Sequence, residues 1–259
     1  DQGARKCICH DRRQGGMPLM RSGGEVVGVL GGMGPEATVD LMRRVIAATP
    51  AQDDADHIRM LVDNNPQVPS RISALIENSG PSPAPVLIAM ARGLCAQGAD
   101  VLVMPCNTAH HYHSEIAAAV DVPFLNLMEL VAEHVMRRHP ALQRVGLLAS
   151  SALANIKIYE PWFEGAGVEV LYPAADRQVA LMAAIRAVKA GRVADQDLSA
   201  FNSAAAGLAN GGAQVLLIAC TELSVIADSL QASLPMYDAA EVLAQAIVAR
   251  SRRPVLPTV

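Results

Sequence analysis

The sequence predicts an α/β protein with two similar parallel-sheet domains, and three observations support this fold class. Short apolar runs alternate along the chain with stretches that have helical spacing. One segment of the first half recurs in the second half. Hydrophobic residues make up 51% of the 259 residues, which is enough for a large buried core. We therefore expect two pseudo-symmetric domains that arose by internal duplication, with an active site in the cleft between them.

The alternation of strands and helices can be followed from one end of the chain to the other. The apolar runs that predict buried parallel strands cover residues 26–30, 57–62, 101–104, 122–127, 145–149, 168–172 and 215–219. The stretches that predict helices cover residues 36–48, 86–97, 127–138, 180–189, 198–210 and 239–250. A Gly-rich turn at 31–35 separates the first strand from the first helix.

The duplication is visible without gaps. Residues 93–106 and 207–220 are identical at seven of fourteen positions, and the opening strand at 27–30 matches 145–148. We expect the halves to be joined near Pro123 and the last helix to return to the first half. The expected domains are 25–122 together with the returning segment 233–259, and 123–232. Residues 1–24 are polar and Gly-rich, and we interpret them as a disordered or tag-like tail.

Composition excludes several classes of function. The chain has 21 basic and 25 acidic residues with no basic run, and aromatic residues make up only 3%, so nucleic acid is not an expected partner. No apolar stretch approaches the roughly 18 residues that span a bilayer. Five cysteines without disulfide-like spacing, and no secretory signal, indicate the reducing cytoplasm. A small-molecule ligand is the partner that remains.

Two cysteines occupy matched positions in the repeat. Cys106 and Cys220 each follow an apolar strand and precede a polar turn that leads into a helix. Ligands of open α/β sheets bind at this edge, and backbone N–H groups at a helix start favour thiolate over thiol. Two thiols facing one cleft suit the inversion of a stereocentre, in which one group removes a proton and the other delivers one. The alternative is that both are core residues kept since the duplication, but the repeat and the polar turns favour the paired role.

Four ordered motifs identify a family. They are Gly-Gly-Met-Gly-Pro at 31–35, Asn-Asn-Pro-Gln-Val-Pro at 64–69, Met-Pro-Cys-Asn-Thr-Ala-His at 104–110 and Cys-Thr-Glu at 220–222. From residue 26 to about 248 the chain resembles the cofactor-independent aspartate/glutamate racemases, and it looks most like the aspartate racemases. The resemblance implies a homodimer in which Cys106 and Cys220 act as acid and base without pyridoxal phosphate and without metal. Glutamate racemases of cell-wall synthesis usually have His where this chain has Glu222, which counts against that branch.

The resemblance also implies a set of substrate-binding residues. Arg71 and Lys189 match the family's carboxylate-binding Arg and Lys. The full implied set is Gly32, Met33, Arg71, Asn107, Thr108, Lys189 and Thr221. Two departures weaken aspartate as the substrate: Ser70 stands where the family usually has Asp, and Ala152-Leu153 replaces a Gly-Thr pair that helps to bind a carboxylate. We expect this change to bring an apolar side chain into the binding site.

Three other motifs resemble sites of a different kind. Cys7, Cys9 and His10 could bind a metal but lack a partner pair of ligands, and His110 with His113 lacks a spaced Cys or carboxylate. We expect His110 to orient the cleft loop, and His111 and His113 to face solvent. The turn at 31–35 lacks the features of a nucleotide site. The functions that remain are an amino-acid racemase, a related isomerase or decarboxylase, and a non-catalytic protein that binds a small molecule.

Overall fold

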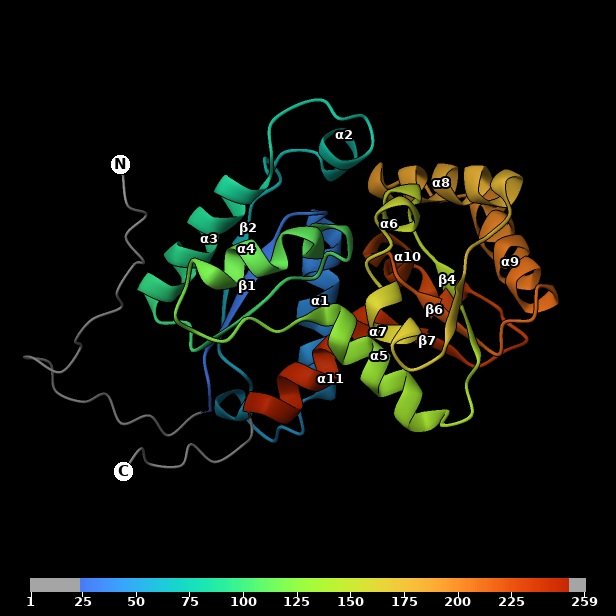
Figure 1. The fold of residues 1–259 in the computed structure, drawn as a ribbon. Helices are drawn as coiled ribbons and strands as arrows, with labels where there is room; N and C mark the ends of the chain where they lie inside the picture. The colour runs from blue at the N-terminus through green and yellow to red at the C-terminus, as the bar shows by residue number, and fades with distance from the viewer. Residues whose placement is uncertain (1–23, 252–259) are drawn as a thin grey trace, which may run out of the picture.

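The computed structural model describes residues 24–251, which form two α/β halves side by side (Figure 1). Each half is built on a parallel sheet, with strand order β2-β1-β3 in the first half and β5-β4-β6-β7 in the second. The shared order, in which the first strand of each half lies between the second and third, is what an internal duplication predicts. The predicted fold class is confirmed.

The first half runs from the opening strand to the helix that leads into the second half. Its strands are β1 (Val27–Gly31), β2 (Met60–Asn64) and β3 (Val101–Val103). Its helices are α1 (Pro35–Ala48), α2 (Arg71–Leu75), α3 (Ala84–Gln97), α4 (His113–Ala118) and α5 (Leu127–Arg138), with short 3-10 helices η1 (Asp54–Asp56) and η2 (Thr108–Tyr112).

The second half repeats this pattern and adds one strand. Its strands are β4 (Arg144–Leu148), β5 (Glu169–Leu171), β6 (Val215–Ile218) and β7 (Met236–Asp238). Its helices are α6 (Ser151–Ile156), α7 (Glu160–Glu164), α8 (Ala175–Lys189), α9 (Asp195–Asn210) and α10 (Thr221–Val225), with the 3-10 helix η3 (Ala227–Ser229), and α11 (Ala239–Ser251) ends the described chain.

The residues shared by the two repeats have a common packing role. A Cβ atom built on Gly28 would lie 2.7 to 3.2 Å from the side chains of Leu102, Ala99 and Leu94. At the equivalent glycine of the second half, Gly146, the contacts at 3.0 to 3.1 Å are the equivalent residues, Leu208, Leu216 and Ala213. The repeated glycine therefore lets a helix pack closely on the middle strand of each sheet, which explains why these positions match.

Two segments differ from the prediction. Residues 122–127 do not form a strand but make one isolated parallel bridge, between Leu102 and Phe124. Pro123 has no N–H to offer a ladder, and Asn126 turns the chain into α5 by accepting hydrogen bonds from two backbone N–H groups. Strand β7 was not predicted. It pairs with β6, so part of the segment that we assigned to the first domain belongs to the second sheet.

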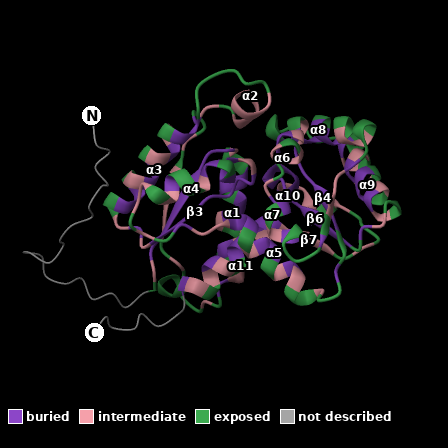
Figure 2. Cartoon of the chain, viewed as in Figure 1, coloured by how far each residue is buried: buried purple, intermediate pink, exposed green. Residues whose placement is uncertain are grey.

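Helices α1, α5 and α11 lie between the two sheets (Figure 1). Helix α11 packs against α1 of the first half and against α5, the helix that leads into the second half. The largest apolar cluster contains strand residues of both sheets together with residues of these helices, and Figure 2 shows buried positions running through this region. The halves therefore share one continuous core, which fixes the edges of the two sheets relative to each other.

Some expectations concern residues at the ends of the chain. The predicted tail, with Cys7, Cys9 and His10, lies outside the described residues apart from Gly24. Within residues 24–251, no helix has both the length and the apolar character needed to cross a membrane.

Candidate active site

A small cavity lies between the two halves, at the carboxyl ends of their strands. Each half contributes six residues to its wall. Those of the first half are Met33, Ser70, Arg71, Ile72, Cys106 and Thr108, and those of the second are Ser150, Met182, Ile185, Lys189, Cys220 and Glu222. Both cysteines of the repeat therefore line the same cavity, as do Met33, Arg71, Thr108 and Lys189 of the predicted set. Gly32, Asn107 and Thr221 are not among the lining residues.

Cys106 lies in the loop between β3 and η2 and is 5% exposed. Its backbone carbonyl accepts a hydrogen bond of 2.8 Å from Nδ1 of His110, a fully buried side chain. Burial lowers the pKa of His110 to about 4, with a smaller contribution from His113, so the ring is uncharged at neutral pH. His110 thus anchors the loop without placing a charge beside the thiol.

The other two histidines of this motif behave differently. His111 is exposed, as expected. The expectation that His113 faces solvent is wrong, because its ring is half-buried, stacks on Phe124 and lies with Nε2 3.0 Å from the Phe124 carbonyl oxygen. Within residues 24–251, no three His, Cys, Asp or Glu side chains group together as metal ligands.

The Cys106 loop is also tied to the second half. The Oδ1 atom of Asn107, a buried side chain, accepts a hydrogen bond of 2.6 Å from the hydroxyl of Tyr159, which precedes α7. The hydroxyl oxygens of Thr108 and Ser150 lie 3.4 Å apart across the cavity wall. These contacts fix the position of one thiol-bearing loop against the opposite half.

Cys220 is the N-cap residue of α10 and is 6% exposed. Its thiol donates a hydrogen bond of 3.1 Å to Oε2 of Glu222, and the other carboxylate oxygen, Oε1, lies 3.1 Å from Nζ of Lys189. Burial and the adjacent Glu222 raise the pKa of the Cys220 thiol well above its usual value, and Lys189 opposes this only in part. The expectation that a helix start favours the thiolate is wrong for Cys220, because burial and a carboxylate outweigh the backbone N–H groups of a short helix.

Glu222 is the residue of this site that sequence reasoning missed. It was noted only as a departure from the His of glutamate racemases. The available signal was its place two residues after the cysteine, in the first turn of α10, where its side chain can reach back to the thiol. Its partner Lys189 ends α8, and nothing in the local sequence connects the two positions.

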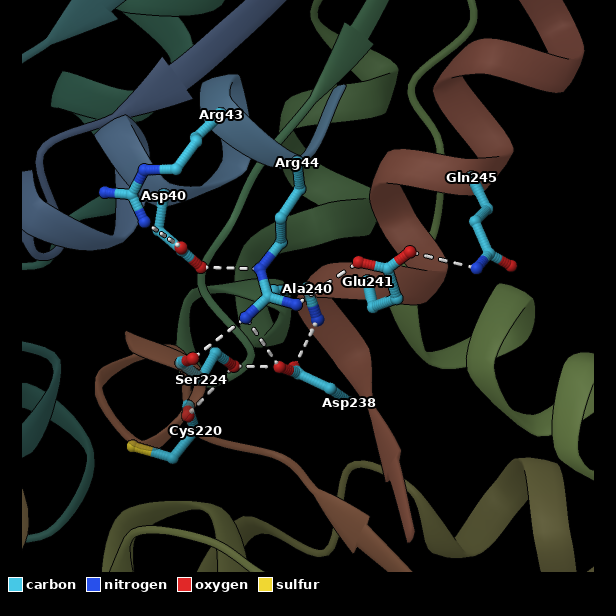
Figure 3. A network of polar contacts seen from close by, with 9 residues as sticks. All are labelled: Asp40, Arg43, Arg44, Cys220, Ser224, Asp238, Ala240, Glu241 and Gln245. Carbon is cyan, nitrogen blue, oxygen red and sulfur yellow. Dashed lines mark hydrogen bonds and ion pairs between the residues drawn. The ribbon is translucent and has the colours of Figure 1, made fainter. Parts of the chain in front are cut away.

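A network of charged side chains contacts helix α10, which begins directly after Cys220 (Figure 3). Arg44 of α1 forms ion pairs with Asp40 at 2.7 Å, Asp238 at 3.0 Å and Glu241 at 3.2 Å, and it donates a hydrogen bond of 2.8 Å to the Ser224 carbonyl. The Ser224 hydroxyl lies 2.6 Å from Oδ1 of Asp238 and 3.5 Å from the Cys220 carbonyl oxygen. An arginine of the first half thereby contacts helix α10, whose N-cap residue is Cys220.

Arg71 and the serines supply hydrogen-bond donors on the cavity wall. The Arg71 guanidinium donates to the carbonyls of Val68, Pro69 and Met33 at 3.1 to 3.4 Å, and within residues 24–251 it has no ion pair. Ser70 caps α2 and Ser150 caps α6, and both line the cavity. A cation without a carboxylate partner beside two hydroxyl groups is suited to bind an anionic group of a ligand.

Ala152 and Leu153 do not enter the cavity, which corrects the expectation drawn from their departure from the family pattern. Both are fully buried, and Leu153 belongs to the apolar cluster shared by the two halves. The physical reason is the cap of α6: the Leu153 N–H donates to the Ser150 hydroxyl oxygen, so the first helical turn points Leu153 into the core and leaves Ser150 at the cavity.

Comparison with known proteins agrees with this architecture. A model of the Asp/Glu/hydantoin racemase family matches residues 30–247. The chain is 28% identical over 227 residues to the broad specificity amino-acid racemase RacX of Bacillus subtilis, a match that covers 86% of this chain and 96% of the relative.

Solved structures give the same result. The structure of the Picrophilus torridus aspartate racemase matches with a TM-score of 0.73 and 30% identity, over 88% of this chain and 94% of that one. A glutamate racemase from Francisella tularensis, solved in complex with D-glutamate, shares the fold with a TM-score of 0.62 and 16% identity, over 87% and 80% of the two chains. The predicted resemblance is confirmed at the level of the family.

Proposed function

The chain belongs to the Asp/Glu/hydantoin racemase family, and from this premise we propose that it is an amino-acid racemase that uses Cys106 and Cys220 for proton transfer at the α-carbon. The observation that supports the proposal most is that two thiols, which follow equivalent strands of a duplicated fold, line one small cavity from opposite halves. Inversion of a stereocentre needs one acid and one base on opposite faces of the reacting carbon, and a pair of thiols can exchange these roles.

Glu222 gives Cys220 a route for its proton. When Cys220 acts as the base, its thiol proton passes to Oε2 of Glu222, and the resulting thiolate removes the proton from the α-carbon. The Cys106 thiol then donates its proton to the opposite face of the carbanion. In the reverse direction the Cys106 thiolate removes the α-proton and the Cys220 thiol donates. Glu222 is ionised again when it releases this proton to solvent, and the Cys106 thiolate takes a proton from solvent before the next turnover in the same direction.

Arg71 is the residue that we expect to hold the α-carboxylate of the substrate. Its lack of a carboxylate partner within residues 24–251 leaves its charge available, and the hydroxyl groups of Ser70 and Ser150 can donate further hydrogen bonds. A fixed α-carboxylate plane would present the α-proton to one thiol and the opposite face to the other. Following the family resemblance, we propose that the reaction uses neither pyridoxal phosphate nor metal and that the enzyme is a homodimer.

Exchange of the α-proton with solvent tests the proposal. We expect the purified protein, with its thiols reduced, to incorporate deuterium from D₂O at the α-carbon of its substrate and to generate the opposite enantiomer. NMR and chiral chromatography measure the two events. A non-catalytic binding protein would bind an amino acid without exchange, and a decarboxylase would release carbon dioxide. Either result would contradict the racemase assignment, and the double variant Cys106→Ser/Cys220→Ser provides the inactive control.

A further inference from the structure

We propose that the substrate is an amino acid with an uncharged aliphatic side chain, an inference that rests on the proposed racemase function and names its substrate class. Three ionisable side chains other than the thiols line the cavity: Arg71, Lys189 and Glu222. Of the two cations, one is paired with Glu222, so a single cation remains to bind one carboxylate of the substrate.

The two cations of the wall are not equivalent. Lys189 lies 3.1 Å from Glu222, so its charge is compensated by a buried carboxylate that also accepts the hydrogen bond of the Cys220 thiol. Arg71 has no ion pair within residues 24–251, and it is the cation that can receive the α-carboxylate. A side-chain carboxylate, as in aspartate, would have to share Arg71 or separate Lys189 from Glu222. The first option places two carboxylates on one cation, where their like charges repel, and the second leaves the buried carboxylate of Glu222 without its partner.

The charges during turnover lead to the same conclusion. Arg71, Lys189 and Glu222 together carry one net positive charge, and the reaction requires one of the two thiols to be ionised. When Cys106 is the thiolate, the wall is neutral overall, which matches an amino acid whose ammonium and α-carboxylate groups cancel. When Cys220 is the thiolate, Glu222 holds its proton and the wall keeps one positive charge. An acidic side chain would add a negative charge next to a thiolate and to the developing carbanion, and like charges at short range oppose both.

Besides the hydroxyl groups of Ser70, Thr108 and Ser150, the rest of the wall consists of four apolar side chains. Ile72 of α2 packs against the apolar cluster of the second half, and Met182 and Ile185 of α8 line the cavity beside it. The sulfur of Met182 accepts a hydrogen bond of 3.2 Å from the Ser151 N–H, which fixes the position of its side chain. Met33 completes this surface. Aliphatic and thioether groups make favourable contact with an aliphatic side chain and give a carboxylate no hydrogen bond.

A substrate panel tests the inference. Rates of α-proton exchange in D₂O are measured by NMR for both enantiomers of norvaline, methionine and leucine, and for those of aspartate, glutamate and lysine. We expect kcat/KM for the best aliphatic amino acid to exceed that for aspartate, glutamate and lysine at least tenfold. An acidic or basic amino acid that is used as well as the best aliphatic one would overturn the inference but leave the racemase proposal intact. Absence of exchange with every amino acid would contradict the proposed function itself.

A designed change in the wall provides a second measurement. Ile72 is half-buried on the short helix α2, so a lysine at this position can keep its ammonium group at the cavity rim. In Ile72→Lys we expect the ratio of aspartate to methionine exchange to rise at least tenfold, whereas the matched variant Ile72→Leu keeps the ratio of the unmodified protein. A ratio that stays unchanged in a folded Ile72→Lys protein, with folding verified by circular dichroism, would count against an apolar side-chain site.

Discussion

The two cysteines occupy equivalent positions in the duplicated halves, but the contacts that hold them differ in kind. The Cys106 loop is anchored by uncharged groups, namely the neutral ring of His110 and the pair of Asn107 and Tyr159. The Cys220 loop is surrounded by charges, with Glu222 and Lys189 on the cavity side and the Arg44 network behind it (Figure 3). Duplication has kept the backbone positions of the thiols and has not kept their electrostatic surroundings.

This difference bears on how the two thiols share the reaction. Burial and Glu222 raise the pKa of Cys220, so this thiol is protonated at rest and is ready to act as an acid. In the proposed mechanism, its conversion to a base uses the carboxylate of Glu222 as proton acceptor. Within residues 24–251 no carboxylate is hydrogen-bonded to the Cys106 thiol, so we expect a proton acceptor on its side to come from substrate or solvent. The proposed mechanism is therefore symmetric in fold and asymmetric in the path of its protons.

Single cysteine variants give the largest effect. We expect Cys106→Ser and Cys220→Ser each to lower racemisation roughly 10⁴-fold, because a hydroxyl group is a far weaker base than a thiolate. The remaining thiol can still exchange the α-proton of the enantiomer that faces it. Deuterium exchange should therefore persist for one enantiomer in Cys106→Ser and for the opposite one in Cys220→Ser. Since overall kcat/KM of a racemase is equal in both directions, exchange is the measurement that separates the thiols, and the same residual enantiomer in both variants would contradict the two-base scheme.

Loss of Arg44 should destabilise the protein strongly, although this residue lies outside the cavity. Arg44→Met leaves the nearly buried carboxylates of Asp40 and Asp238 without their main partner, and breaking such a pair costs roughly 3–5 kcal/mol. Urea unfolding measures the loss. The matched control is Arg43→Met, because Arg43 pairs with the same Asp40 but its side chain is 64% exposed. We expect the control to change stability by less than about 0.5 kcal/mol, and equal losses in both variants would show that the network is not a support of the Cys220 loop.

Replacement of Glu222 tests the asymmetry directly. We expect Glu222→Gln to lower racemisation about 100-fold or more, within the usual range for a lost acid–base group. Removal of the carboxylate also removes a cause of the raised pKa of Cys220, so its alkylation by iodoacetamide should begin at lower pH. Mass spectrometry quantifies each cysteine separately. The alkylation of Cys106 should not change, nor should either cysteine respond to Glu129→Gln, an exposed carboxylate of α5.

The uncharged anchor of Cys106 should be sensitive to acid. Burial lowers the pKa of His110 from 6.5 to about 4. Between these two pH values the histidine is protonated in the unfolded chain and uncharged in the folded chain. Stability from this group is complete above pH 6.5 and is lost as the pH falls toward 4, by about 3 kcal/mol in total. In His110→Gln we expect this part of the pH dependence to be absent from the free energy of unfolding. A profile with the same slope between pH 6.5 and 4 in the variant would assign the acid sensitivity to other groups.

The repeat explains why so much could be predicted from the sequence. It identified both cysteines and the strands they follow, and the close packing at Gly28 and Gly146 shows that the matched positions are constrained by contacts within each half. What could not be predicted depends on contacts between distant segments. The pair of Lys189 and Glu222 joins two helices of the second half, and the Arg44 network joins the two halves. Strand β7 has only three residues, too few for a periodic pattern, and its position is set by pairing with β6.

The smallest effect is expected for Arg71, whose proposed role is the same whichever thiol acts as the base. Arg71→Ala removes the proposed partner of the α-carboxylate, and a charge-assisted hydrogen bond contributes roughly 1.5–3 kcal/mol, so kcat/KM should fall about 10- to 100-fold. Because the α-carboxylate keeps its place whichever thiol removes the proton, we expect exchange of both enantiomers to fall by the same factor. Arg71→Lys keeps the charge without the fork geometry and should recover part of the loss. A loss confined to one enantiomer would place Arg71 with one thiol and would extend the asymmetry of the two halves to substrate binding.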